Sequence, residues 1–514
     1  MIRILFLLFF SVQALSQTPL IEWQRCYGGS ANDFPKRIIE GRNNDLIMVG
    51  HTLSTDGDII GGNDSMNIFW LRVDTLGNIL NSRVLGAGGY DDASDVIAAW
   101  DNGYIVLGNT TSVNDVTNQH GSQDIWIVKV SIQGVPQWEK CFGGSDFEAA
   151  RSIIKTKDSC YVICGFTYSN DGDISFNHGT SDMWMFKIDK TGNLLWERTY
   201  GDGPGDYAND IIQTSDNGFL VCGATFSDSG QVSGNNGSQD FWIIKTDSAG
   251  NLQWAECYGG GFLDAAYRIE ELNSNYYIIG VNISKDGDVS NNHLDGTAAS
   301  PDTWLICIDS IGQLLWERSL GGSRIESSSE ILFSSQSFFL GAYASSNDGD
   351  VNYHPGSSSS DFWIIQTDTS GNILWNNCYG GTGHDYLESM LIVGNSLYAL
   401  GQTRSNDIDV SGNHGGIDFW LFKIKIDNLT NSIVKQKDEH SFSFFPNPAN
   451  NLINFKTAKN ALLNVYDIQG KLIMSEIIEG QLIKDVSELS NGTYLLESVF
   501  DNFIREFNYL IISH

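Results

Sequence analysis

The chain has 514 residues, which is long for one ordinary domain and predicts several domains or one large repeat body. Its 54 glycines, 8 prolines and numerous aromatic residues favour short strands joined by tight turns, so we expect an all-β protein. The net charge of −32 at pH 7 repels polyanions and argues against nucleic acid or an anionic membrane surface as a partner.

The first residues have the parts of a secretory signal peptide. Arg3 precedes an apolar run from Ile4 to Val12, and small residues follow up to Ser16. This pattern predicts a cleaved signal over residues 1–16 and export of the chain. The apolar run is short for a membrane span, and no later segment reaches about 18 uninterrupted apolar residues, so we expect no transmembrane segment.

Residues 17–427 contain seven copies of one repeat, spaced by about 58 residues. One copy shows the internal plan, because the segments 208–214, 219–227, 240–248 and 251–259 read as four strands with Asn-Gly and Gly-Asn turns at the short connections. Four short strands per copy are typical of a propeller blade. The third strand of each copy carries a tryptophan: Trp70, Trp126, Trp184, Trp242, Trp304, Trp363 and Trp420.

The two ends of the repeat region complement each other. A lone fourth strand begins at Pro19, whereas the seventh copy stops after the third strand that begins at Asp418. A ring in which the N-terminal strand completes the last blade would pair both fragments and remove two exposed sheet edges. We therefore predict a seven-bladed β-propeller with four-stranded blades over residues 17–427.

An acidic loop after the second strand provides candidate metal ligands. The stretch SNDGDIS runs from Ser169 to Ser175. Counted from Asp171, oxygen-bearing side chains occupy positions 1, 3 and 5, and Asp182 follows at position 12, as in an EF-type calcium loop. Three copies fit this spacing, with the candidate ligands Asp56, Asp58 and Asn67; Asp171, Asp173, Ser175 and Asp182; and Asp407, Asp409, Ser411 and Asp418. No copy has the bidentate glutamate of a strong site. We expect weak structural Ca²⁺ and no other cofactor, or else a turn whose side chains bond the local backbone.

These loops share one face with the loops between blades, because successive strands are antiparallel. Asp33, Asp146, Asp264 and Asp385 in the inter-blade loops lead us to expect a strongly acidic loop face. Histidines recur in the acidic loops, and since each loop offers one histidine and no cysteine, we expect them to pack within the turns rather than to bind a transition metal. These histidines are His120, His178, His293, His354 and His414.

After a polar linker over 428–440, residues 441–514 have no repeat landmark and read as a small β-sandwich. Three ordered motifs, FPNPANN from Phe445, VYDIQGKLI from Val465 and LSNGTYLL from Leu489, resemble the type IX secretion C-terminal sorting domain of Bacteroidetes. The resemblance implies export through the periplasm, an interaction of residues 441–514 with the type IX secretion machinery, and release or display at the outer surface. The repeats also resemble propeller-like arrays of secreted proteins from that group. This second resemblance implies no particular activity.

The repeats carry no recognised catalytic motif: no nucleophile elbow, phosphate-binding loop or HExxH run is present. The stretch TSDNGF from Thr214 resembles the Asp-box of sialidase propellers, which is a structural turn. We therefore name no catalytic residue and expect a secreted or surface-displayed binding module that holds a glycan or a protein on its acidic loop face. The alternatives are an extracellular propeller enzyme that degrades polysaccharide or peptide near the central channel, and a structural scaffold of the envelope.

Overall fold

The computed structural model describes residues 19–426 except 64, 87, 113–115, 117–118, 294–299 and 356–358. It also describes residues 442–512 except 446–451, 458–460, 468–470, 479–480, 488, 491 and 501–504. The predicted signal peptide and linker lie outside these residues. The chain divides into two compact units, Met1–Thr430 and Asn431–His514, and every element in the described residues is a strand. No helix long and apolar enough to cross a membrane occurs in this described part.

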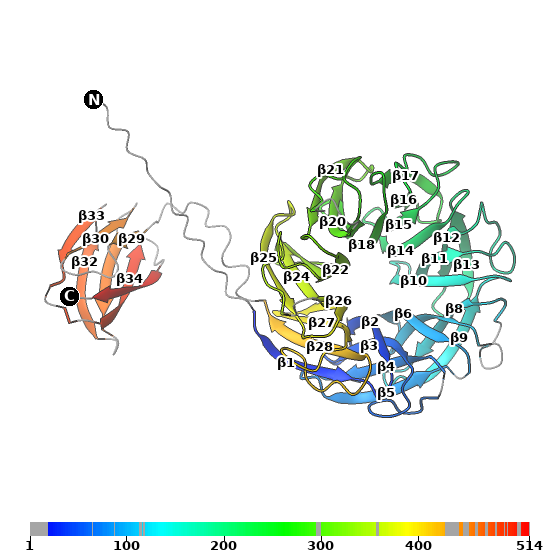
Figure 1. Ribbon diagram of the computed structural model, residues 1–514, viewed down its shortest axis with the longest axis horizontal. Coiled ribbons are helices and arrows are strands. Elements are labelled where there is room, and N and C mark those ends of the chain that lie inside the picture. Colours follow the sequence, from blue (N-terminus) through cyan, green and yellow to red (C-terminus); the bar gives the residue numbers. More distant parts are fainter. Residues whose placement is uncertain are drawn as a thin grey trace. The chain divides into compact units, whose positions relative to one another are not determined.

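The first unit consists of seven four-stranded antiparallel sheets arranged in a ring (Figure 1). Blades 1 and 2 are β2 (Asp33–Glu40), β3 (Leu46–Thr52), β4 (Asn67–Val73) and β5 (Ile79–Leu85), then β6 (Asp91–Ala98), β7 (Tyr104–Thr110), β8 (Asp124–Val130) and β9 (Pro136–Phe142). Blades 3 and 4 are β10 (Glu148–Lys155), β11 (Tyr161–Thr167), β12 (Asp182–Ile188) and β13 (Leu194–Tyr200), then β14 (Asp206–Gln213), β15 (Phe219–Thr225), β16 (Asp240–Thr246) and β17 (Leu252–Tyr258). Blades 5 and 6 are β18 (Asp264–Leu272), β19 (Asn275–Asn282), β20 (Asp302–Ile308) and β21 (Leu314–Leu320), then β22 (Glu326–Ser334), β23 (Ser337–Ala344), β24 (Asp361–Thr367) and β25 (Ile373–Tyr379).

Blade 7 closes the ring as predicted. It contains β26 (Asp385–Val393), β27 (Ser396–Thr403) and β28 (Asp418–Lys425), and its outer strand is β1 (Ile21–Tyr27) from the start of the chain. β1 pairs antiparallel with β28, so that Cys26 lies opposite Trp420. The two ends of the repeat region therefore satisfy each other's backbone groups, and the prediction of a seven-bladed propeller is confirmed.

The hydrophobic core of the ring lies at the junctions between blades. Seven clusters of buried side chains are present, and each takes its members from two neighbouring blades. The largest fully buried side chains include six of the seven third-strand tryptophans, and Trp242 at 0% exposure is typical. Because an indole buries about 150–250 Å² of surface, these rings provide much of the cohesion between blades.

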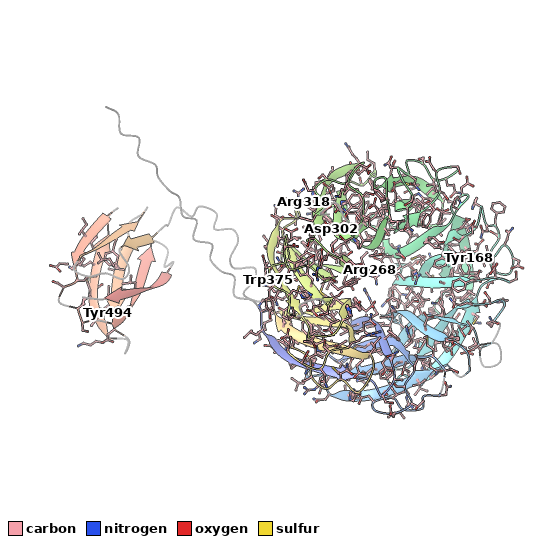
Figure 2. The ribbon with its side chains drawn as sticks, viewed as in Figure 1. Tyr168, Arg268, Asp302, Arg318, Trp375 and Tyr494 are labelled. Atoms are coloured by element: carbon pink, nitrogen blue, oxygen red, sulfur yellow. The ribbon has the colours of Figure 1, made fainter. Side chains whose placement is uncertain are left out.

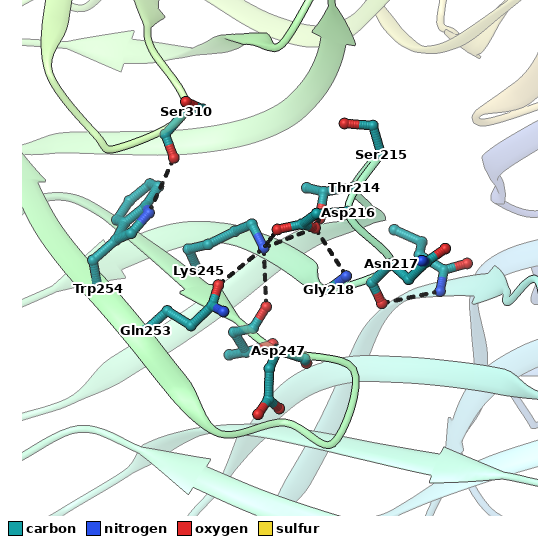
Figure 3. A network of polar contacts seen from close by, with 12 residues as sticks. Thr214, Ser215, Asp216, Asn217, Gly218, Lys245, Asp247, Gln253, Trp254 and Ser310 are labelled. Carbon is teal, nitrogen blue, oxygen red and sulfur yellow. Dashed lines mark hydrogen bonds and ion pairs between the residues drawn. The ribbon is translucent and has the colours of Figure 1, made fainter.

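The hairpins on the opposite face are tied to the blades by buried lysines. Figure 3 shows Lys245 of β16, whose Nζ lies 2.8 Å from Oδ2 of Asp216 and donates to Gln253 Oε1 at 3.2 Å. Asp216 Oδ1 also accepts from Thr214 Oγ1 at 2.5 Å and from the Gly218 amide at 3.0 Å. The TSDNGF turn is therefore a structural element, as its resemblance to an Asp-box implied.

The second unit contains two packed sheets. One sheet is formed by β29 (Phe442–Phe445), β30 (Leu452–Thr457) and β33 (Gln481–Asp485), and the other by β32 (Leu472–Ile478), β31 (Ala461–Tyr466), β34 (Gly492–Phe500) and β35 (Arg505–Ile512). Ile453 and Phe455 of the first sheet share one core with Leu463, Val465 and Leu496 of the second. This is the small β-sandwich that the alternating pattern predicted.

Candidate functional site

The innermost strand of every blade contains a one-residue register shift at the same step. Such β-bulges re-aim the extra side chain and are common beside functional sites. We call the seven extra residues the bulge ring; they are Lys36, Ser94, Arg151, Asn209, Tyr267, Ser329 and Glu388. All seven line a single cavity of about 470 Å³.

We call this cavity the central cavity. It lies in the central channel of the ring, at the end where the first, innermost strand of each blade begins. That end belongs to the loop face, since the inter-blade loops lead directly into these strands. Asp92 near the start of β6 and His51 near the end of β3 complete its wall. The cavity thus lies on the face from which we expected a ligand to be bound, but its walls come from strands rather than from the acidic loops.

The central cavity is rich in cations for so acidic a protein. Lys36, Arg151 and Arg268 line it together with only two carboxyl groups, those of Asp92 and Glu388. Lys36 Nζ lies 3.6 Å from Glu388 Oε2. The Arg151 guanidinium lies over the Phe166 ring at 5.3 Å, and no carboxylate oxygen of the described residues lies within 4.0 Å of it.

Burial shifts the titration of several groups in this wall. It lowers the pKa of His51 to about 4, so the imidazole is neutral at physiological pH. It also lowers the pKa of Arg151, a shift that the charge of Asp92 opposes and the charge of Arg268 increases. The pKa values of Asp92 and Glu388 are raised, mainly by burial. The cavity is therefore partly desolvated, and charge–charge interactions inside it are stronger than at an open surface.

The residue after each bulge forms a second ring, the plug ring, which is Arg37, Asp95, Ser152, Asp210, Arg268, Glu330 and Ser389. Arg37 Nη1 lies 2.5 Å from Glu330 Oε2, and Ser152 Oγ donates to Asp210 Oδ1 at 2.9 Å. Arg268 Nε lies 3.7 Å from Glu330 Oε1, and Figure 2 shows Arg268 near the middle of the ring. Arg268 lines both the central cavity and a second cavity of about 540 Å³ beyond, so this ion-pair network separates the two.

Aromatic rings of blades 3 and 4 pack behind Arg151, whose guanidinium lies over Phe166. The Phe166 and Tyr207 rings are 4.9 Å apart and edge-to-face, and the Tyr168 and Tyr207 hydroxyls lie 3.2 Å apart. Phe226 packs against Tyr207 at 6.3 Å and is 40% exposed. This cluster supports the Arg151 side chain from outside the cavity lining.

The predicted calcium-loop residues at position 1 bind the neighbouring inter-blade loop. Oδ1 of Asp56 accepts the Ser30 amide at 2.7 Å, and Asp171 and Asp407 accept the Ser145 and Thr382 amides at 2.7 and 2.8 Å. The amide hydrogen bonds of Ser30 and Ser145 lower the pKa values of Asp56 and Asp171, and the Thr382 hydroxyl, together with its amide, lowers the pKa of Asp407. At position 3, Oδ2 of each aspartate accepts a glycine amide: Asp58 from Gly28 at 3.3 Å, Asp173 from Gly143 at 3.1 Å and Asp409 from Gly380 at 3.2 Å.

The other candidate ligands have different partners. Oδ2 of Asp182 and Asp418 lies 2.5 and 2.6 Å from the Nδ1 atoms of His178 and His414, and the Asn67 side chain donates to Asn63 at 2.8 Å. Ser175 Oγ donates to Glu197 Oε1 at 2.5 Å, whereas Ser411 Oγ accepts from Gln24 at 2.5 Å. Within the described ranges, no group of three or more His, Cys, Asp or Glu is placed to hold a metal ion. The calcium site stays a prediction.

Four histidines of the acidic loops pack within their turns in the described residues, as expected. His120, His178, His293 and His414 each place Nδ1 within 3.1 Å of Oδ2 of the aspartate that opens the third strand. Each of these imidazoles thus holds the acidic loop against its own blade.

The blade junctions contain buried acidic pairs that our sequence reasoning missed. At each junction the Asp or Asn that opens the third strand and the acidic residue that opens the next blade's first strand lie against one glycine, and both are fully buried. A methyl group on Gly201, for example, would lie 2.8 Å from Asp182 Oδ1 and 2.5 Å from Asp206 Oδ2. The junction pairs are Asn67 and Asp91, Asp124 and Glu148, Asp182 and Asp206, Asp240 and Asp264, Asp302 and Glu326, Asp361 and Asp385, and Asp418 and Asp33.

The junction pairs correct part of the expected loop face. Asp33, Asp264 and Asp385 are fully buried instead of facing solvent, because they accept hydrogen bonds from the adjacent glycine amides at 2.8 to 2.9 Å. Asp146 is exposed, as are the position-1 aspartates. The recurring Gly-Gly followed by an acidic residue was the sequence signal for these pairs.

Residues 443–511 match the family of the secretion system C-terminal sorting domain. No curated protein matches the chain. Similar solved structures include the WD40 domain of Neurospora crassa Pan2, at 10% identity and a TM-score of 0.42, covering 77% of this chain and 97% of that one. The polysaccharide lyase Uly1 has 9% identity and a TM-score of 0.43, with coverage of 78% and 90%, and YCF48 bound to D1 peptide has 9% and 0.40, with coverage of 81% and 100%.

Proposed function

Since the chain ends in a secretion sorting domain and is therefore exported to the medium or the cell surface, we propose that its propeller is an extracellular binding module. The ligand enters the central cavity from the loop face. The sorting domain implies an interaction with the secretion machinery, which leaves the propeller as the part that acts after export.

The bulge ring is the observation that carries this proposal. Its seven positions are equivalent in the backbone, yet they hold six different residue types, with only serine used twice. By contrast, the third-strand tryptophan is the same in all seven blades. The repeat architecture thus does not dictate the side chains of the bulge ring, and a varied polar wall is what selective recognition requires.

A glycan suits this cavity better than a protein surface does. Its volume of about 470 Å³ fits a few sugar units rather than a folded partner. The hydroxyl and amide groups of Ser94, Asn209 and Tyr267 can bind sugar hydroxyls, and the Tyr267 ring also lines the cavity.

An enzyme that acts on polysaccharide is the second candidate, and the two carboxyl groups of the cavity favour it. Asp92 and Glu388 line the same cavity and both have raised pKa values, and a protonated carboxyl group can donate a proton to a glycosidic bond.

A glycan array probed with the full-length secreted protein, followed by product analysis on every bound glycan, tests both functions. We expect binding without cleavage. Cleavage of a bound glycan would establish the enzyme instead, and the absence of any bound glycan would contradict the proposed function.

A further inference from the structure

We infer that the ligand of the central cavity carries a negative charge, as a carboxylate- or sulfate-bearing saccharide does, and that Arg151 binds this charge. The inference rests on the proposed function and specifies the chemical class of its ligand.

Arg151 is a solvent-exposed cation in the wall of the central cavity. It is the extra residue of the bulge in β10, and its guanidinium lies over the Phe166 ring at 5.3 Å. No carboxylate oxygen of the described residues lies within 4.0 Å of it. An anion from solution can therefore reach the guanidinium and form an ion pair with it.

The carboxylates near Arg151 are already engaged. Glu388 lies beside Lys36, and Glu330 of the plug ring is bound by Arg37 at 2.5 Å. Asp95 accepts the Ile153 amide at 3.1 Å, and Asp210 accepts the Ile269 amide at 3.0 Å. Asp92, in the same wall as Arg151, interacts with it electrostatically, but no carboxylate oxygen of the described residues lies within the 4.0 Å of an ion pair with Arg151.

Arg268 adds a second cationic group to the same wall. Its Nε atom is buried and has no hydrogen-bond partner, and its nearest carboxylate oxygen, on Glu330, is 3.7 Å away. Burial lowers the pKa of Arg151, the charge of Asp92 opposes this shift, and the charge of Arg268 adds to it, so the two guanidinium groups repel each other. An anion that binds between them relieves this repulsion and gains charge-assisted hydrogen bonds.

The polar residues between these cations suit a sugar. Asn209 and Tyr267 follow Arg151 in the bulge ring, and Asn209 Nδ2 donates to the Ala266 carbonyl at 2.8 Å, which fixes the amide in one orientation. The wall thus combines charge recognition by two arginines with neutral hydrogen-bonding groups.

The test compares acidic and neutral forms of one saccharide by titration calorimetry on the full-length secreted protein. The probes are a uronic-acid oligosaccharide, its carboxyl-reduced neutral form and a sulfated oligosaccharide of equal length. We expect the neutral form to bind at least about tenfold more weakly than an acidic one, since a charge-assisted hydrogen bond is lost. The two acidic probes distinguish carboxylate from sulfate.

Two variants test whether Arg151 is the residue that binds the negative charge of the ligand. Arg151→Gln should weaken the acidic probe about tenfold and leave the neutral form unchanged. Arg198→Gln is the matched control, because Arg198 also packs over an aromatic ring, Trp196, at 6.0 Å, but on an outer strand away from the cavity. The control should bind as the wild type does.

The outcomes separate the inference from the proposed function. Equal binding of acidic and neutral forms, or an unchanged affinity in Arg151→Gln, overturns the inference and leaves a neutral-glycan module. Failure of all saccharides to bind contradicts the proposed function itself.

Discussion

The blade junctions and the bulge ring are built from the same seven repeats, yet they differ in how uniform their side chains are. The junctions repeat a buried tryptophan, a glycine and an acidic pair around the ring. The bulge ring repeats only the backbone distortion and varies its side chains. The difference shows that the junctions maintain the ring and that the bulge ring is available for recognition.

The largest effect should come from the junctions. Trp242→Ala removes a fully buried indole between blades and should destabilise the propeller by about 3–5 kcal/mol. Ser329→Ala in the bulge ring is the comparison and should cost about 1 kcal/mol or less, since it loses one weak hydrogen bond to Gly341 at 3.3 Å. Chemical denaturation of both variants measures the difference, and equal losses would remove the distinction between the two regions.

The junction pairs also predict a pH dependence. Burial raises the pKa values of Asp206 and Asp240 to about 7 in the folded protein, well above the ordinary aspartate value. The folded state therefore holds protons that the unfolded state releases, so the stability that these two groups contribute is fully present at low pH and is lost as the pH rises through about 7. Each group should contribute about 1 kcal/mol of extra stability at pH 6 relative to pH 8.

Denaturant titrations at pH 6 and pH 8 measure this contribution. Asp240→Asn should reduce the pH dependence, because it places at the fourth blade the amide that Asn67 already supplies at the first. Two results would show that the junction carboxyl groups are not the source of the pH dependence. One is a wild-type stability that rises from pH 6 to pH 8, and the other is an unchanged difference in stability between the two pH values in Asp240→Asn.

Calcium should have the smallest effect. Extracellular sites of this kind bind with dissociation constants of about 10⁻⁴–10⁻³ M, so 10 mM Ca²⁺ would add roughly 1–3 kcal/mol per occupied site in the best case and less where occupancy is partial. Because the position-1 and position-3 aspartates already accept backbone amides, we expect the lower part of this range. Melting with calcium and with chelator measures the effect, and the combined Asp407→Ala and Asp409→Ala variant should abolish it. Identical melting of the wild type in both conditions would refute calcium binding.

The ring could be predicted from the sequence because the residues that mark each blade recur at a regular spacing. The third-strand tryptophans repeat in every blade, and the lone strand at Pro19 complements the short last copy at Asp418, so both blade number and closure could be derived. The sorting domain could be predicted from three local motifs.

The candidate site could not be predicted, because its residues are far apart in the chain and its geometry depends on bulges. Lys36, Arg151 and Arg268 belong to blades 1, 3 and 5, and a bulge leaves no clear mark on an alternating strand pattern. The partners of the acidic loops could not be predicted either, because they come from other parts of the repeat region. Asp58 binds the amide of Gly28, against which Asp418 of the preceding blade also packs.

The most direct test of the central claim is the glycan affinity of a bulge-ring variant measured together with its stability. Tyr267→Ala removes a ring and a hydroxyl from the central cavity and should weaken binding of the best array glycan at least about tenfold. Its melting temperature should fall far less than that of Trp242→Ala. Unchanged affinity in Tyr267→Ala, with a normal melting temperature, would contradict the assignment of the ligand to the bulge ring.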